Sequence, residues 1–181
     1  MKVTFKYGLK GCSNHPQQSP WAKVNGSYAA TIAGVPSESF SILSNAPFVT
    51  YIHTKYKQDE MWSILKESQK NKYFVCTNTG GSEEAEKMGL VKGHTYSLIE
   101  LKEFVLPDDK KLKLIKLRNP WGSFEWKGNY SDKSNSWDIL PNLRQDAGWC
   151  DQNDGYFFME FKDFLFYYPY TFMCKYHKDY Y

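Results

Sequence analysis

Three side-chain types in this sequence could carry out covalent chemistry together, namely histidine, asparagine and cysteine. An asparagine amide can hold a histidine ring in one tautomer and one plane, and that histidine can then take the proton of a thiol. His94 and Asn119 are the candidates for such a pair. The thiols are Cys12, Cys76, Cys150 and Cys174. Their long spacings contain no CxxC motif, so we expect reduced cysteines and neither a zinc site nor a disulfide framework.

A predicted hairpin brings His94 and Asn119 together. Residues 94–104 and 111–118 have the pattern of two strands, and Leu106-Pro107-Asp108-Asp109 between them has the residue chemistry of a turn. In an antiparallel hairpin the numbers of opposed residues have a constant sum, so a turn centred near 106 or 107 places Asn119 opposite His94. Spacing alone leaves a second interpretation open, in which two polar residues merely end their strands.

The residues around the pair resemble those of a known family. The string Gly-Leu-Val-Lys-Gly-His-Thr-Tyr-Ser-Leu at 89–98 and the string Leu-Arg-Asn-Pro-Trp-Gly at 117–122 resemble the histidine and asparagine motifs of the calpain family of cysteine proteases. Further similar segments are Ala-Lys-Val-Asn-Gly-Ser-Tyr at 22–28, Glu125-Trp126, Ser136-Trp137, Asp-Gly-Tyr-Phe-Phe-Met at 154–159 and Phe-Lys-Asp-Phe at 161–164. The resemblance therefore covers about residues 20 to 175.

This resemblance implies roles for three residues and the absence of others. His94 would be the catalytic base, Asn119 its orienting partner, and Trp121 the ring that shields their hydrogen bond. The family's first half of the protease core supplies an oxyanion Gln and a Gly-x-Cys-Trp nucleophile, and neither is present in this sequence. Cys12 precedes His94 but is followed by Pro16 and Pro20 rather than by a helix that would lower the pKa of its thiol. We therefore do not expect Cys12 to be the nucleophile.

The resemblance also implies a candidate calcium site. Ca²⁺ prefers several hard oxygen ligands, and the matching positions are Glu125, Asp132 and Asp154, with a backbone carbonyl near Gln152. Tyr156 occupies the position of a fourth carboxylate, which would weaken binding. The alternative is that these acids are solvated loop residues or helix caps.

The expected fold is α+β, mainly an antiparallel sheet or half-barrel with a few short helices, resembling the C-terminal subdomain of the calpain core. Expected strands are 3–7, 48–56, 73–77, 94–104, 111–118, 156–161 and 170–176. Expected helices end near Asn25-Gly26, open near Pro36, run from an N-cap at Asp59 to about Lys70, lie within the Glu-rich segment before Met88, and span about 162–167. A long irregular stretch covers 121–154. We divide the chain into an N-terminal arm (1–20), the protease-like subdomain (21–176) and a tail (177–181).

Composition narrows the classes of function. The net charge of +3 has no accompanying basic stripe, so nucleic-acid binding is not expected. No apolar run is long enough for a membrane span or a secretory signal, which predicts an intracellular, cytoplasmic protein.

Two functions stay open. One is a non-catalytic pseudoprotease that binds partners, which we favour because no nucleophile is present. The other is half of a calcium-dependent endopeptidase whose nucleophile comes from another chain or a longer gene product. Either predicts a protein partner over an exposed half-cleft.

Overall fold

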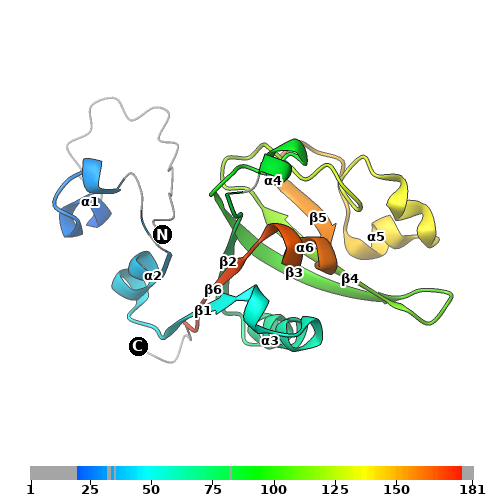
Figure 1. Cartoon of the computed structure of the whole chain (residues 1–181), viewed down its shortest axis with the longest axis horizontal. Helices are drawn as coiled ribbons and strands as arrows, with labels where there is room; N and C mark the ends of the chain where they lie inside the picture. Colours follow the sequence, from blue (N-terminus) through cyan, green and yellow to red (C-terminus); the bar gives the residue numbers. More distant parts are fainter. Residues whose placement is uncertain (1–19, 32–33, 35, 82, 177–181) are drawn as a thin grey trace.

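A computed structural model describes residues 20–31, 34, 36–81 and 83–176. They form an α+β fold with one six-stranded antiparallel sheet and short helices, as the sequence predicts (Figure 1). The strands are β1 (Phe48–Ile52), β2 (Phe74–Asn78), β3 (Thr95–Val105), β4 (Lys111–Arg118), β5 (Tyr156–Glu160) and β6 (Tyr170–Cys174). The α-helices are α1 (Pro20–Val24), α2 (Pro36–Ser44), α3 (Gln58–Lys70), α4 (Glu83–Lys87), α5 (Leu143–Ala147) and α6 (Phe161–Tyr167). The 3-10 helices are η1 (Ala29–Thr31), η2 (His53–Lys55) and η3 (Asn135–Ile139).

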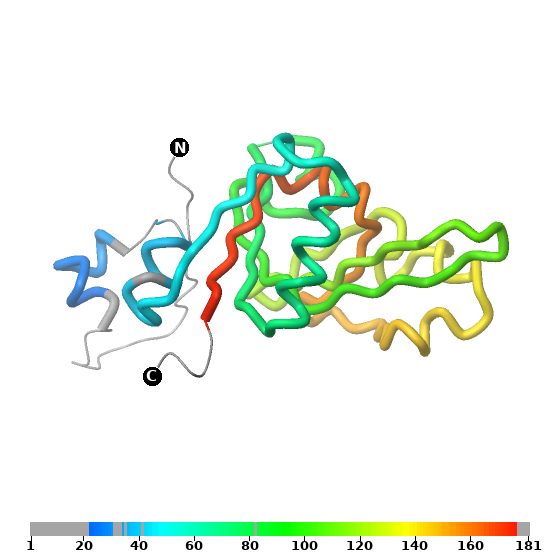
Figure 2. Tube along the Cα trace, turned by 90° about the horizontal axis from the view of Figure 1, so that it is seen from below, coloured from blue at the N-terminus to red at the C-terminus, as the bar shows by residue number. Residues whose placement is uncertain are grey.

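The strand order differs from the order along the chain. The sheet runs β1-β6-β2-β3-β4-β5, so β6 lies between β1 and β2 and pairs with both (Figures 1 and 2). The β3–β4 hairpin is the longest pairing, from Ser97 opposite Arg118 to Val105 opposite Lys111. It extends well beyond β2, which pairs with β3 only over residues 95–97. The outer half of the hairpin therefore projects from the sheet.

Two apolar clusters hold the sheet and its helices together. The larger joins α3 and α6 to the sheet through fully buried side chains such as Leu65, Tyr96 and Phe164. The smaller is built around Trp137 of the irregular 121–154 segment, which packs against Phe158 of β5. Because the 121–154 segment packs on this separate apolar cluster, its backbone has one defined conformation. It also contains η3 and α5, two helices that the sequence pattern does not predict.

The amphipathic pattern of α3 is predicted correctly, but its start is not. Met61, Trp62 and Leu65 are buried on one face, as expected. The N-cap is Lys57 rather than Asp59, and Asp59 lies in the first turn, where it forms an ion pair with Lys113 at 2.7 Å. An acidic residue is favourable in either position because the first turn exposes backbone N–H groups. The residue type alone therefore cannot show whether an aspartate is the N-cap or lies in the first turn.

Other element boundaries shift by a few residues. The strand predicted for 48–56 ends at Ile52, because the chain turns into η2, where the His53 N–H donates to the Pro169 carbonyl at 3.0 Å. The last strand ends at Cys174 instead of residue 176. The predicted strand at 3–7, Cys12 and the 177–181 tail lie outside the described residues. No helix in the described part of the chain is long and apolar enough to cross a membrane.

Candidate active site

The backbone of His94 is fixed by a neighbouring threonine. His94 lies directly before β3 and follows Gly93, whose φ of +63° allows the chain to turn into the strand. The Thr79 N–H donates to the His94 carbonyl at 3.0 Å, and the His94 N–H donates to Thr79 Oγ1 at 3.0 Å. Thr79 is itself fully buried after β2. Two elements of the sheet thus hold His94 in place.

Asn119 is held in the same way at the end of β4. Its N–H donates to the Gly155 carbonyl at 2.8 Å, and its carbonyl accepts from the Gly122 N–H at 3.0 Å. Its side-chain Nδ2 donates to the carbonyls of Ser123, at 2.6 Å, and Phe124, at 3.2 Å. The Nδ2 group is therefore directed at the loop after β4. That arrangement leaves Oδ1 to face the histidine.

His94 and Asn119 form the expected pair, with 2.8 Å between His94 Nε2 and Asn119 Oδ1. The tautomer follows from the amide. Since Nδ2 donates to two carbonyls and the Trp121 N–H donates to Oδ1 at 3.1 Å, Oδ1 is an acceptor and His94 Nε2 must carry the hydrogen. Nδ1 of the neutral ring is then a base. Within the described residues no hydrogen bond engages that Nδ1.

The predicted contact is correct, but the predicted hairpin register is not. Ser97 pairs with Arg118, so the position facing Asn119 is that of Tyr96, and His94 lies two residues further along. The turn is centred near Asp108 instead of 106 or 107, and an irregularity between Leu98 and Glu100 changes the register by one. The pair still meets because His94 precedes its strand, Asn119 follows its own, and side chains bridge the remaining distance.

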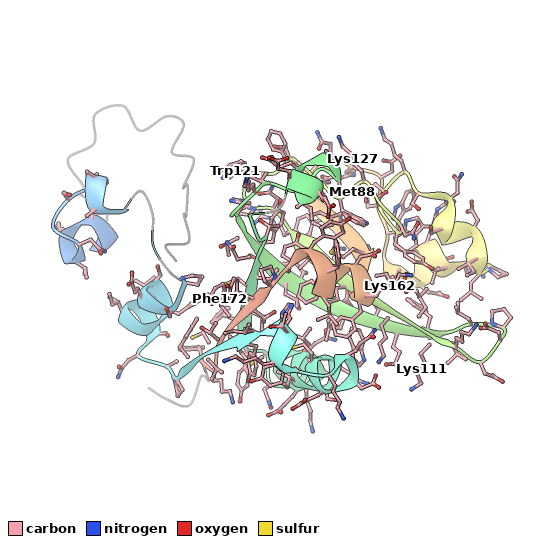
Figure 3. All side chains as sticks on the ribbon, viewed as in Figure 1. Met88, Lys111, Trp121, Lys127, Lys162 and Phe172 are labelled. Carbon is pink, nitrogen blue, oxygen red and sulfur yellow. The ribbon has the colours of Figure 1, made fainter. Side chains whose placement is uncertain are left out.

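Trp121 packs against the His94 ring as expected. Their ring centroids are 4.3 Å apart and tilted by 42°. The indole is 36% exposed, and Phe124, 59% exposed, meets it edge to face at 6.1 Å. In Figure 3, Trp121 lies on the side of the molecule that carries Met88, just after α4. His94 is thus covered on one side by a ring that is open to solvent.

Burial sets the charge state of His94. Desolvation lowers the pKa of its imidazole below the ordinary value of 6.5, and the hydrogen bond to Asn119 offsets part of that shift. The imidazole is therefore neutral near pH 7. A neutral ring with Nε2–H directed at an amide oxygen can accept a proton at Nδ1 from a thiol.

No described cysteine is placed to use this base. Cys76 and Cys174 are buried, and burial raises the pKa of the Cys76 thiol far above its ordinary value. Cys150 is exposed but borders a separate cavity with Asp132 and Tyr156. Each hydrogen bond that His94 makes in the described part of the chain is to Thr79 or Asn119. A thiol that gave its proton to this base would have to come from outside the described residues.

Two of the predicted calcium ligands, Asp132 and Asp154, line one cavity of about 190 Å³ together with Tyr156, whereas Glu125 is not among its lining residues. Asp132 Oδ2 is buried without a partner in the described structure. Burial, followed by the charge and hydrogen bond of Glu125, raises the pKa of Asp132 to about 7. Asp151, which the sequence reasoning missed, and Asp154 add to this repulsion. Such uncompensated acidic oxygens have the donor chemistry that Ca²⁺ requires.

The same acids also make structural bonds. Glu125 Oε1 accepts from the Gly155 N–H at 2.6 Å, and Asp154 Oδ1 accepts from the Tyr156 N–H at 2.9 Å. No group of three metal-ligating side chains is assembled within coordination reach among the described residues. The types of donor atom therefore fit calcium. The hydrogen bonds of Glu125 and Asp154 already hold part of the loop before β5 in place. Bound calcium would supply positive charge between the acids and order these loops.

Two residues that position the pair were missed by sequence reasoning, Thr79 and Gly155. Thr79 gives no sequence signal, because a threonine at a strand end is common. Gly155 has a detectable signal, since an Asp-Gly step before a strand often marks a left-handed turn. Its φ is +86°, and a Cβ there would lie 2.7 Å from the Asn119 carbonyl oxygen. The glycine is required for the close approach of its loop to Asn119.

Comparison with known proteins supports the interpretation of the motifs. Residues 17–175 match the sequence profile of the calpain family cysteine protease. The chain is 32% identical to human (Homo sapiens) Calpain-14 over 158 residues, 87% of this chain and 23% of that protein. It is 34% identical to the Calpain-1 catalytic subunit of Rattus norvegicus over 152 residues, 82% of this chain and 21% of the relative. The chain thus spans less than a quarter of the length of these curated relatives.

Proposed function

Because the chain belongs to the calpain family of cysteine proteases, we propose that its sheet supplies the histidine and asparagine half of a calpain-type thiol protease site. One observation carries this proposal. The bond between His94 and Asn119 is formed, with the His94 tautomer fixed, although none of the described cysteines lies next to it. A pair kept in working geometry is expected where a nucleophile meets it.

In this proposal His94 Nδ1 takes the proton of an incoming cysteine thiol. Asn119 holds the imidazolium that results, and Trp121 keeps water from the Nε2–H···Oδ1 bond. The thiol would come from a Gly-x-Cys-Trp segment on another polypeptide or in a longer product of the same gene. The exposed rings of Trp121 and Phe124 next to His94 mark the face that this partner would cover.

A second candidate is the non-catalytic binding subunit that the sequence favours. The observation in its favour is that none of the described cysteines can act as the nucleophile. In that case the same face would bind a partner without chemistry. An intracellular location belongs to both candidates.

The two candidates separate in one experiment. The chain is co-purified from its native source, its partners are identified by mass spectrometry, and the complex is treated with an epoxide affinity probe for cysteine proteases. We expect labelling of a partner cysteine in a Gly-x-Cys-Trp segment. His94→Ala should lower peptide hydrolysis by the complex by about 100- to 10,000-fold, the range for loss of a general base.

The matched control is Gln145→Ala, which removes an exposed amide from the same long segment and should leave hydrolysis unchanged. Stable partners without such a cysteine, together with no labelled thiol, would establish the binding subunit instead. Hydrolysis that survives His94→Ala would contradict the role of the pair.

A further inference from the structure

The β3 strand has a backbone edge that no other strand covers. β2 pairs with β3 only at Thr95, Tyr96 and Ser97, whereas β3 continues to Val105 with β4 on its other side. Residues 98–105 therefore have one edge without a strand partner in the described structure. Such an edge is a template for pairing with another extended chain.

The edge is only partly covered by α3. The Leu101 N–H donates to Gln69 Oε1 at 2.6 Å, which shows that the backbone groups of Leu101 face away from β4. Because backbone groups alternate along a strand, those of Glu103 and Val105 face the same way. The Val105 side chain is 62% exposed. An added strand would find outward donors and acceptors at Glu103 and Val105 that pair with no described strand.

A cavity of about 380 Å³ lies between this edge and α3. Lys66 and Lys70 line it from the helix, and Lys102 lines it from the strand. Lys66 and Lys70 are exposed and form no ion pair with any described residue, and they are neighbours on one helix face because they are four residues apart. Like charges at that spacing repel each other, so an anionic occupant would relieve the repulsion.

The acidic groups at the cavity are already engaged. Glu103 accepts from Lys111 Nζ at 3.0 Å and from Trp62 Nε1 at 2.9 Å, and Glu100 pairs with Lys102 at 2.9 Å. The residues that line the cavity include three lysines, Lys66, Lys70 and Lys102, and one acid, Glu103, which also interacts with the charge of Lys66, so the net charge presented to a ligand is positive. In Figure 3, Lys111 of this region and Trp121, which packs on His94, lie on opposite sides of the molecule.

We propose that the free edge of β3, residues 98–105, binds an extended acidic peptide segment of a partner protein as an added strand. The main chain of the peptide would pair with the outward groups of Glu103 and Val105 and with the carbonyl of Leu101, whose N–H stays bonded to Gln69, and its carboxylates would meet Lys66 and Lys70. Backbone pairing supplies affinity in this mode, and the flanking charges select the sequence. The surface acts independently of His94 and of the proposed protease function.

The test uses the full chain and fluorescence anisotropy with a labelled peptide of alternating glutamate and valine. We expect saturable binding that weakens as salt rises, and a double variant Lys66→Glu/Lys70→Glu that binds about tenfold more weakly or worse. Lys127→Glu reverses an exposed lysine elsewhere and should bind like the wild type. His94→Ala should also bind like the wild type, which separates this surface from the catalytic pair.

A second peptide shows whether binding depends on backbone pairing with β3 or on charge attraction alone. The same sequence with alternate amides N-methylated keeps its charge but cannot pair along one edge, so we expect its binding to be lost. Amide chemical shifts of residues 98–105 should move with the first peptide only. The proposal would be overturned if both peptides bound equally, if Lys127→Glu weakened binding as much as the double variant, or if nothing bound at low salt. The lysines would then only protect an exposed edge strand from unwanted pairing.

Discussion

Two histidines of the described chain are buried, and they differ in what surrounds the second ring nitrogen. His94 directs Nε2 at Asn119 Oδ1 and leaves Nδ1 without a hydrogen bond to any described residue. His53 places Nε2 2.8 Å from Thr171 Oγ1, packs its ring at 5.1 Å from that of Phe164, and leaves Nδ1 buried without a partner among the described residues. The sequence around His53 predicts no role for it, because no local sequence pattern shows that a histidine is buried.

The His53 environment predicts a pH dependence of stability. Burial lowers the pKa of His53 to about 4, and the Tyr168 backbone offsets only part of that shift. A histidine with a lowered folded pKa stabilises the protein above the unfolded value of about 6.5, and that stability is lost as pH falls through about 4. The loss attributable to His53 is about 3 kcal/mol, and His94 adds to it in the same direction.

The measurement is chemical denaturation of wild type and His53→Gln at several pH values from 7 to 4. Glutamine can keep a hydrogen bond to Thr171 but does not titrate, so its curve should be flatter. A variant that loses stability as steeply as wild type would show that His53 is not responsible.

At the residue scale, the contact between His94 and Asn119 could be predicted because the motif that contains each of them is local. Asn-Pro-Trp-Gly at 119–122 and the histidine string at 89–98 identify the side chains without knowledge of the fold. Thr79 and Asp151 could not be found in this way. Their roles depend on contacts between segments that are distant in sequence, and no residue type marks them.

At the element scale, the β3–β4 hairpin shows both the strength and the limit of pattern reasoning. The two strands were predicted within about one residue, because alternation and turn residues are strong signals. The register was not, because it depends on the turn centre and on the irregularity between Leu98 and Glu100. Asp109 adopts a φ of +59°, which fixes the turn in a way that Pro-Asp-Asp does not specify.

The loop before β5 supplies a test of how Asn119 is held. In Gly155→Ala, the added Cβ would lie 2.7 Å from the Asn119 carbonyl oxygen and 2.9 Å from the Gly122 Cα, so the backbone must shift. Gly148→Ala is the matched control, since it has a similar positive φ and no atom within 4 Å of the added Cβ. The control should lose about 1 to 2 kcal/mol from the left-handed conformation alone.

We expect Gly155→Ala to lose more stability than the control and to change the NMR chemical shift of the His94 Nε2 hydrogen. Thermal unfolding and nitrogen-proton spectra of both variants provide the measurement. Equal losses, with an unchanged His94 resonance, would show that Asn119 does not depend on this close approach.

At the scale of the whole molecule, calcium would act through the stability of the fold. An ion that binds the folded state alone stabilises it by about 2.7 kcal/mol at 100 times its dissociation constant, which raises the melting temperature by several degrees. We expect calcium at millimolar concentration to raise the melting temperature of wild type but not of Asp132→Asn. Asp146→Asn, an exposed acid on α5, serves as the control that keeps the response. No shift in wild type would refute the site.

Without calcium, Asp132 should act in the opposite sense from His53. Its folded pKa is raised to about 7, so stability falls as pH rises from the ordinary carboxyl range through about 7. At pH 8, Asp132→Asn should therefore melt at a higher temperature than wild type. A lower melting temperature for the variant would show that the carboxylate is compensated by a favourable contact.

The position of β6 affects how the chain can fold during synthesis. Among the described strands, β1 pairs with β6 alone, which is made more than a hundred residues later. While the ribosome is still adding the intervening segments, none of the described strands made so far pairs with β1, and its ring side chains stay open to other nascent chains or to chaperones. Completion of this sheet is therefore a late event in translation, and release from the ribosome before Tyr170–Cys174 has emerged would leave β1 unpaired.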